Sequence, residues 1–252
     1  MVFLKKELKE YYRSGRLFII GIAALLVGLM NVAVAKLTPW LLETLADSLE
    51  EAGMSVTAKT VDASACWQQY YKNMPMFLII ILVVFAGSFA KEYGKGTLLL
   101  VVTKGYPRSK IFIAKTLMMV GCYTLASLVC FGLTYFYADF YWDNSVVSDI
   151  AYAALLYFVF GLLLVSVIIF FSSFISEATG IIGATAGYVM LLYLLGVIPK
   201  LKKYLPIKLS EAESLLYGKA EIPDYTPALI ISLTLIVGFI ILGAVFFKKK
   251  KL

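Results

Sequence analysis

The chain has 252 residues, of which 61% are hydrophobic and 15% charged, with a formal net charge of +7 and a mean hydropathy of +0.87. Soluble domains are about 45–50% apolar and about 25% charged, so the composition excludes a soluble globular protein and indicates an integral membrane protein. The sequence contains no histidine and three cysteines, which excludes a histidine-based metal site and a disulfide framework.

Residues 1–16 predict an interfacial elbow helix. Basic residues alternate there with apolar side chains that recur at the helical period. The apolar stripe is formed by Leu4, Leu8, Tyr11 and Tyr12. Such a helix lies on an anionic membrane surface. A cleaved signal peptide is the alternative for residues 1–35, but Glu7 and Glu10 count against it.

Six apolar stretches are long enough to cross a bilayer, which requires about 20 helical residues. The expected fold is an all-α integral membrane protein with a single transmembrane domain over 1–252. The predicted spans are 17–35, 74–90, 111–135, 150–171, 180–198 and 229–247. Segments 36–73 and 199–228 then form two long outer loops, and 91–110 is the longest inner connection.

Both outer loops are predicted to contain a helix. In the first, a threonine-proline pair predicts a helix over 38–53. This helix either rests on the membrane or on its own bundle, or caps a translocation mouth and attracts cationic substrates. In the second, Ser210 and Glu213 have capping-box spacing, which predicts a short helix up to Gly218.

Charge predicts the orientation. With both termini in the cytosol, inner segments hold 15 Lys and Arg against 8 outside, and 12 of the 16 acidic residues are outside. The positive-inside rule favours this arrangement. The lysines of the last outer loop weaken the bias and leave open a re-entrant fifth span. In that span, Gly183 and Gly187 form a GxxxG pattern, which packs against a helix of the same chain or of another subunit.

The third span contains a lysine, two cysteines and a cluster of aromatic residues at its outer end. Lys115 lies one turn inside the membrane, and we expect its long side chain to snorkel to the inner interface. Cys122 and Cys130 are interpreted as small core residues, whereas Cys66 is expected in the first outer loop. The aromatic residues over 135–142 are typical of an interfacial belt.

The inner segment 91–110 contains a short apolar run, Leu98 to Val102, between charged residues. Five residues cannot span a bilayer, and the flanking charges keep the run at the membrane face. Gly94 and Gly96 allow a sharp turn before it. The run therefore predicts a short helix, which either packs under its own bundle or docks to a soluble partner.

The order Glu92, Gly96-Thr97, apolar run, Pro107-Arg108-Ser109 resembles the connection between spans two and three in permease subunits of type-2 ATP-binding-cassette (ABC) exporters. The resemblance implies that this segment carries a short cytosolic coupling helix, which rests on a separate ABC ATPase subunit. The coupling residues it assigns are Glu92, Gly96, Thr97, Leu98, Leu99, Val102, Pro107 and Arg108. It also implies a bacterial cytoplasmic membrane and a second permease, either another copy or a paralogue.

The sequence contains no GxxxxGK[ST] motif, so ATP-Mg is expected to bind only in the partner subunit. No catalytic, cofactor or metal site and no nucleic-acid partner are expected in this chain. Few charges lie at the centres of the spans, which argues against a proton-coupled carrier. The resemblance implies export of an amphipathic peptide, such as a bacteriocin, antimicrobial or toxin peptide. Export of lipid, glycolipid or sodium is the alternative within the family, and a six-span sensor or scaffold is the alternative from another class.

Overall fold

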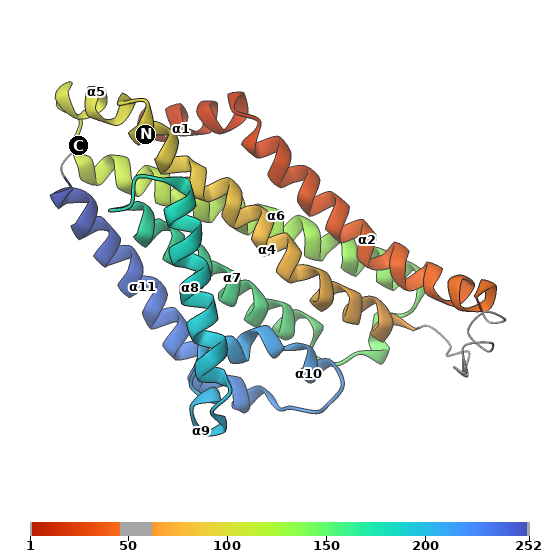
Figure 1. The fold of residues 1–252 in the computed structure, drawn as a ribbon. Helices are drawn as coiled ribbons and strands as arrows, with labels where there is room; N and C mark the ends of the chain where they lie inside the picture. The colour runs from red at the N-terminus through yellow and green to blue at the C-terminus, as the bar shows by residue number, and fades with distance from the viewer. Residues whose placement is uncertain (1, 46–61, 251–252) are drawn as a thin grey trace.

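The computed structural model describes residues 2–45 and 62–250, and this part of the chain is helical without a strand (Figure 1). Six helices are long and apolar enough to cross a membrane. They are α2 (Arg16–Thr44), α4 (Ala63–Gly94), α6 (Arg108–Tyr141), α7 (Ile150–Ser172), α8 (Ala178–Gly196) and α11 (Thr226–Lys249). The all-α class and the six apolar helices are therefore confirmed.

Several helices extend beyond the stretches that hydropathy predicts. Helix α4 begins at Ala63, so Cys66 is buried inside a helix and does not lie in a loop. Helix α2 continues through Pro39, which shows that no new helix begins at residue 38. Pro39 has no backbone N–H to donate to the Ala35 carbonyl, and membrane helices tolerate such a loss. The remainder of that predicted helix falls largely within 46–61, outside the described residues.

Helix α7 is the centre of the bundle. In its most apolar stretch 72% of the residues are buried inside the protein, against 17% in α8 and in α11. Lipid tails are as apolar as leucine, so close packing and polar contacts hold such helices together. Two consecutive side-chain hydrogen bonds join α2, α4 and α6. Asn73 donates to Asn31 at 2.8 Å, and Asn31 donates to Thr134 at 3.0 Å.

The segment between α8 and α11 forms four short helices, and buried apolar residues of the last three pack back against the bundle. They are α9 (Pro199–Lys202), η2 (Pro206–Glu211), α10 (Glu213–Leu216) and η3 (Ile222–Tyr225). The predicted capping box at Ser210 is wrong, because this residue lies inside η2 and its hydroxyl donates to the Ile207 carbonyl. A reciprocal capping box instead joins Glu221 and Asp224 at the start of η3.

Helix α8 runs from one end of the bundle to the other, so the fifth apolar helix is not re-entrant (Figure 1). Its GxxxG pattern has no close neighbour in this structure. A methyl group added at Gly183 or Gly187 would meet no heavy atom within 4 Å. Among the described residues, the prediction that these glycines pack against another helix of the same chain is therefore wrong.

Candidate functional site

Helix α5 (Thr97–Thr103) connects α4 to α6 and lies across the end of the bundle that also carries α1 (Val2–Arg13) and the end of α11 (Figure 1). Left-handed glycines flank it, with φ of 63° at Gly96 and 83° at Gly105. Glycine reaches this conformation without the steric penalty of a β-carbon. The chain therefore turns sharply on both sides of a helix of seven residues.

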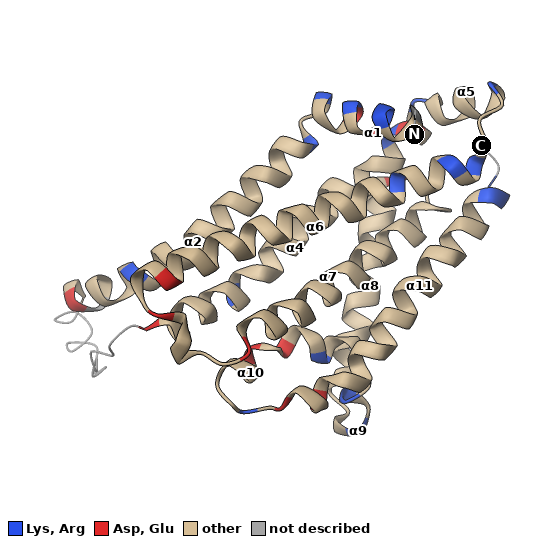
Figure 2. Cartoon of the chain, turned by 180° about the vertical axis from the view of Figure 1, so that it is seen from behind, with Lys and Arg blue, Asp and Glu red and all other residues tan. Residues whose placement is uncertain are grey.

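Charge separates the two ends of the molecule. Most described Lys and Arg residues lie near α1, α5 and the adjoining ends of α6 and α11, which we call the basic end (Figure 2). Most described Asp and Glu residues lie at the opposite end, around α10 and the end of α2 (Figure 2). Helix α5 therefore sits on the positively charged end of the molecule.

The apolar residues of α5 face in different directions. Leu98 is 1% exposed and packs into the core of the bundle, and Val102 is half-buried against the same core. Leu99 and Leu100 are 45% and 60% exposed. Leu99 and Leu100 are therefore the main residues of the predicted apolar run that lie on the outward surface of α5.

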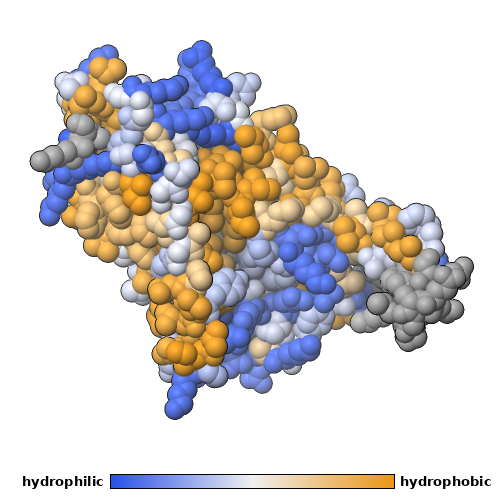
Figure 3. Space-filling model, in the orientation of Figure 1, coloured by the Kyte–Doolittle hydropathy of each residue, from blue (hydrophilic) through white to orange (hydrophobic). Residues whose placement is uncertain are grey.

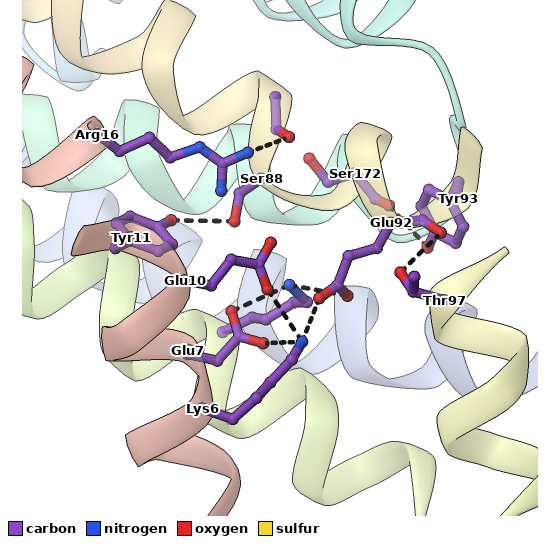
Figure 4. Close-up of polar contacts among 12 residues, drawn as sticks. Lys6, Glu7, Glu10, Tyr11, Arg16, Ser88, Glu92, Tyr93, Thr97 and Ser172 are labelled. Atoms are coloured by element: carbon purple, nitrogen blue, oxygen red, sulfur yellow. Dashed lines mark hydrogen bonds and ion pairs between the residues drawn. The ribbon is translucent and has the colours of Figure 1, made fainter. Parts of the chain in front are cut away.

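An ion cluster lies near the start of α5 and joins α1, α4 and α6 (Figure 4). The Lys115 ammonium of α6 lies 3.0 Å from a Glu92 carboxylate oxygen of α4 and 3.1 Å from a Glu7 carboxylate oxygen of α1. Lys115 and Glu7 are fully buried. The expected snorkelling of Lys115 is wrong, because two carboxylates inside the bundle satisfy its charge and α1 covers it.

Lys6 and Glu10 complete the ion cluster at its edge. Lys6 lies 3.1 Å from a carboxylate oxygen of Glu7 and of Glu10, and it also pairs with Glu92. Burial would lower the pKa of the Lys6 ammonium, but the hydrogen bond and negative charge of Glu92 outweigh it and raise that pKa above its ordinary value. Lys6 therefore remains charged at any physiological pH.

Three carboxylates of the ion cluster, from Glu7, Glu10 and Glu92, lie close enough together to hold a metal ion. Two ammonium groups already lie among them and compensate two of the three negative charges. The buried ion pairs therefore join α1, α4 and α6, and we call this arrangement the ionic lock. Breaking a buried ion pair by removing one partner typically costs about 3–5 kcal/mol.

Helix α1 has two different faces. Phe3, Glu7 and Tyr11 are buried against the bundle, and the Tyr11 hydroxyl donates to Ser88 of α4 at 3.0 Å (Figure 4). Tyr11 therefore does not share the exposed stripe that the sequence predicts. The other three members of that stripe are exposed and apolar: Leu4, Leu8 and Tyr12.

The remaining predicted coupling residues fix the ends of α5 and α6. The Thr97 hydroxyl donates to the Glu92 carbonyl at 3.5 Å, and Pro107 precedes the first residue of α6. Arg108 donates to the Lys248 and Lys250 carbonyls at the end of α11, where a cation is favourable. The structure thus brings together most of the predicted set, while Gly183 and Gly187 lie apart on α8.

Sequence reasoning missed the α1 members of the ion cluster: Lys6, Glu7 and Glu10. A signal for one of them exists in hindsight, because Glu7 lies one turn from Phe3 and from Tyr11 on the same helical face. A carboxylate between two aromatic residues that both pack inward needs a buried cation. Lys115 inside the third span needed a buried anion for the same reason.

The fold and this basic end define a multi-pass helical membrane protein with a short connecting helix at one face. Residues 49–252 match the family described as "Protein of unknown function (DUF2705)", and the chain belongs to this family. The matched range contains α5, Glu92 and Lys115 but not α1. No curated protein and no solved structure matches the chain.

Proposed function

We propose that the chain is the transmembrane permease subunit of a type-2 ABC exporter, and that a separate ABC ATPase binds α5. The observation that carries the proposal is the exposed pair Leu99 and Leu100 on a helix too short to enter a bilayer. Burying a leucine side chain is worth roughly 1.5–3 kcal/mol. Both leucines lie beside a basic surface, which suits a partner groove with acidic residues at its rim.

The position of α5 supports a mechanical role. Its inward Leu98 packs against the bundle, and Glu92, five residues before α5, holds Lys115 on α6 and Lys6 on α1. A push on α5 therefore acts on three helices through packed and charged contacts rather than through a flexible loop. ATP hydrolysed in the partner subunit would move these helices together.

The proposed assembly contains two six-helix units. The interior of this bundle is filled around α7, so a peptide-wide path requires a second permease, either another copy or a paralogue. The charge separation in Figure 2 supports an orientation with both termini in the cytosol, following the positive-inside rule, and the resemblance to ABC permeases carries the proposal of a bacterial cytoplasmic membrane. The proposed cargo is an amphipathic peptide, which suits a protein with few charges at mid-membrane.

Replacing Leu99 with Asp tests the docking role. The carboxylate would be desolvated inside the partner groove, so we expect the variant to insert normally but to lose co-purification with a co-expressed ABC ATPase by at least tenfold. ATPase stimulation by the permease should fall in parallel. The measurement is the ATPase recovered per permease after affinity purification in detergent.

Val146→Asp is the matched control, because Val146 is 66% exposed and lies at the end opposite to α5. This variant should retain the ATPase. If Leu99→Asp also retains the ATPase and its stimulated turnover, α5 is not the docking site. A six-span sensor or scaffold would then be the better explanation.

A further inference from the structure

A cavity of about 850 Å³ opens at the end of the bundle opposite to α5. Its wall combines the last turns of α2 and the first turns of α4 with η2, α10 and the turn that follows α10. The volume falls in the range of about 300–1,000 Å³ that is usual for ligand sites. Hydrophilic residues cover this region, over the N-terminal part of α4 and over α10 (Figure 3).

The framework of the cavity is fixed by its own contacts. The Tyr217 hydroxyl donates to the Ser64 carbonyl at 3.3 Å, which joins the turn after α10 to the start of α4. Glu211 pairs with Lys202 at 2.8 Å, so its charge is compensated. The Tyr217–Ser64 contact holds the two sides of the cavity together, and neither contact uses the side chains of Gln68, Gln69 or Glu213.

Three half-buried polar side chains in the wall are available to a ligand: Gln68, Gln69 and Glu213. None of the hydrogen bonds and ion pairs among the described residues involves these side chains. Each glutamine amide offers both donors and an acceptor, which is the pairing that a peptide group requires. The Glu213 carboxylate accepts charge-assisted hydrogen bonds from ammonium or guanidinium groups.

The charge of the wall favours a cationic ligand. Asp62 and Glu213 contribute two carboxylates besides the paired Glu211, and Lys219 is the basic residue among the lining side chains. The Lys219 ammonium lies 5.5 Å from the centroid of the Tyr217 ring, a cation–π contact on its own segment. The wall therefore keeps an excess of negative charge.

We propose that this cavity binds a cationic segment of a peptide, with the two glutamines holding its backbone and Glu213 holding an amino or guanidino group. The inference rests on the proposed function for the identity of the cargo, and it places a peptide site at the exit side of the permease. Binding at this site needs no ATPase, so it is measurable on the permease alone.

The test uses the full chain in a neutral detergent and a short fluorescein-labelled Lys/Leu peptide, followed by fluorescence anisotropy. The same peptide with its amines acetylated measures the charge contribution. We expect Glu213→Gln to weaken binding of the cationic peptide about tenfold, the usual effect of losing one hydrogen bond to a charged group. Gln69→Ala should weaken both peptides, because it removes a contact to the backbone.

Glu43→Gln is the matched control, since Glu43 is exposed near the end of α2 and does not line the cavity. It should leave affinity unchanged, and all variants should elute at the wild-type position in size-exclusion chromatography. Equal affinity of wild type and Glu213→Gln would overturn the proposal. Displacement of the peptide by maltose together with unchanged binding by Glu213→Gln would instead assign the cavity to a neutral sugar headgroup.

The two proposals fail separately. Loss of ATPase co-purification in Leu99→Asp together with no peptide binding leaves the permease role standing and removes the cavity assignment. Peptide binding that depends on Glu213 in a chain that never retains an ATPase keeps the cavity and removes the ABC assignment.

Discussion

Lys115 illustrates at the residue scale what a sequence can and cannot reveal. Hydropathy places it near the end of a membrane helix, where a lysine usually extends to the interface. The structure buries it completely, because Glu7 from α1 and Glu92 from α4 meet its ammonium. Which face of α1 turns inward depends on tertiary contacts, so the sequence alone could not pair these groups.

Replacing Lys115 with Met should be strongly destabilising. The substitution leaves Glu7 and Glu92 buried with Lys6 as their remaining cation, and we expect a loss of about 3–5 kcal/mol in unfolding free energy. Lys110→Met, on an exposed lysine of the same helix, should change stability by less than about 0.5 kcal/mol. The measurement is unfolding in detergent, followed by tryptophan fluorescence.

A double substitution makes the test of Lys115 specific. If the ionic lock is the cause, adding Glu92→Gln should recover part of the loss, because one uncompensated carboxylate is removed. Strictly additive losses in the double variant would show that Lys115 and Glu92 do not interact.

At the scale of elements, the apolar spans are predictable and their polar extensions are not. Helix α4 begins at Ala63 rather than at residue 74, because its first turns are polar and contribute nothing to hydropathy. What starts the helix is Asp62, whose carboxylate accepts hydrogen bonds from the Ser64 and Ala65 amides at 3.0 and 3.4 Å. Aspartate is among the preferred N-cap residues, but the predicted spans rest on hydropathy, which does not register a cap.

Asp62→Ala should loosen the first turn of α4 by about 1 kcal/mol, the usual effect of losing an N-cap side chain. The hydrogen bond from the Ser64 hydroxyl lowers the Asp62 pKa below its ordinary value of 3.8. A carboxyl group with a lowered pKa stabilises the fold above that ordinary value, and the contribution disappears as the pH falls through the lowered pKa. Amide hydrogen exchange in the first turn of α4 should therefore differ between wild type and Asp62→Ala at neutral pH, and the difference should disappear as the pH falls through the lowered pKa. A difference that persists at acidic pH would show that the carboxylate is not the cap.

At the scale of the whole molecule, the charge distribution and the proposed docking of an ATPase to α5 predict the same orientation, with the basic end in the cytosol. The basic end carries α1, α5 and the end of α11 (Figure 2), and the cavity lined by Glu213 lies at the acidic end. The sequence predicts this unequal distribution of charge, because Lys and Arg can be counted in the inner and outer segments without knowledge of the tertiary structure. The cavity was not predictable, because residues more than 140 positions apart in the sequence, such as Gln68 and Glu213, form its wall.

The orientation predicts which engineered thiols an impermeant maleimide reaches in intact cells. The native cysteines give a clean background, because Cys66, Cys122 and Cys130 are all buried, and Cys66 is therefore unsuitable as a reporter. Ser109→Cys lies exposed at the basic end and Val146→Cys lies exposed at the opposite end. Because the positive-inside rule places the basic end in the cytosol, Val146→Cys should be labelled in intact cells and Ser109→Cys only after permeabilisation. The reverse pattern would place α5 outside the cell, where no ATPase could reach it, and would overturn the permease assignment together with the orientation.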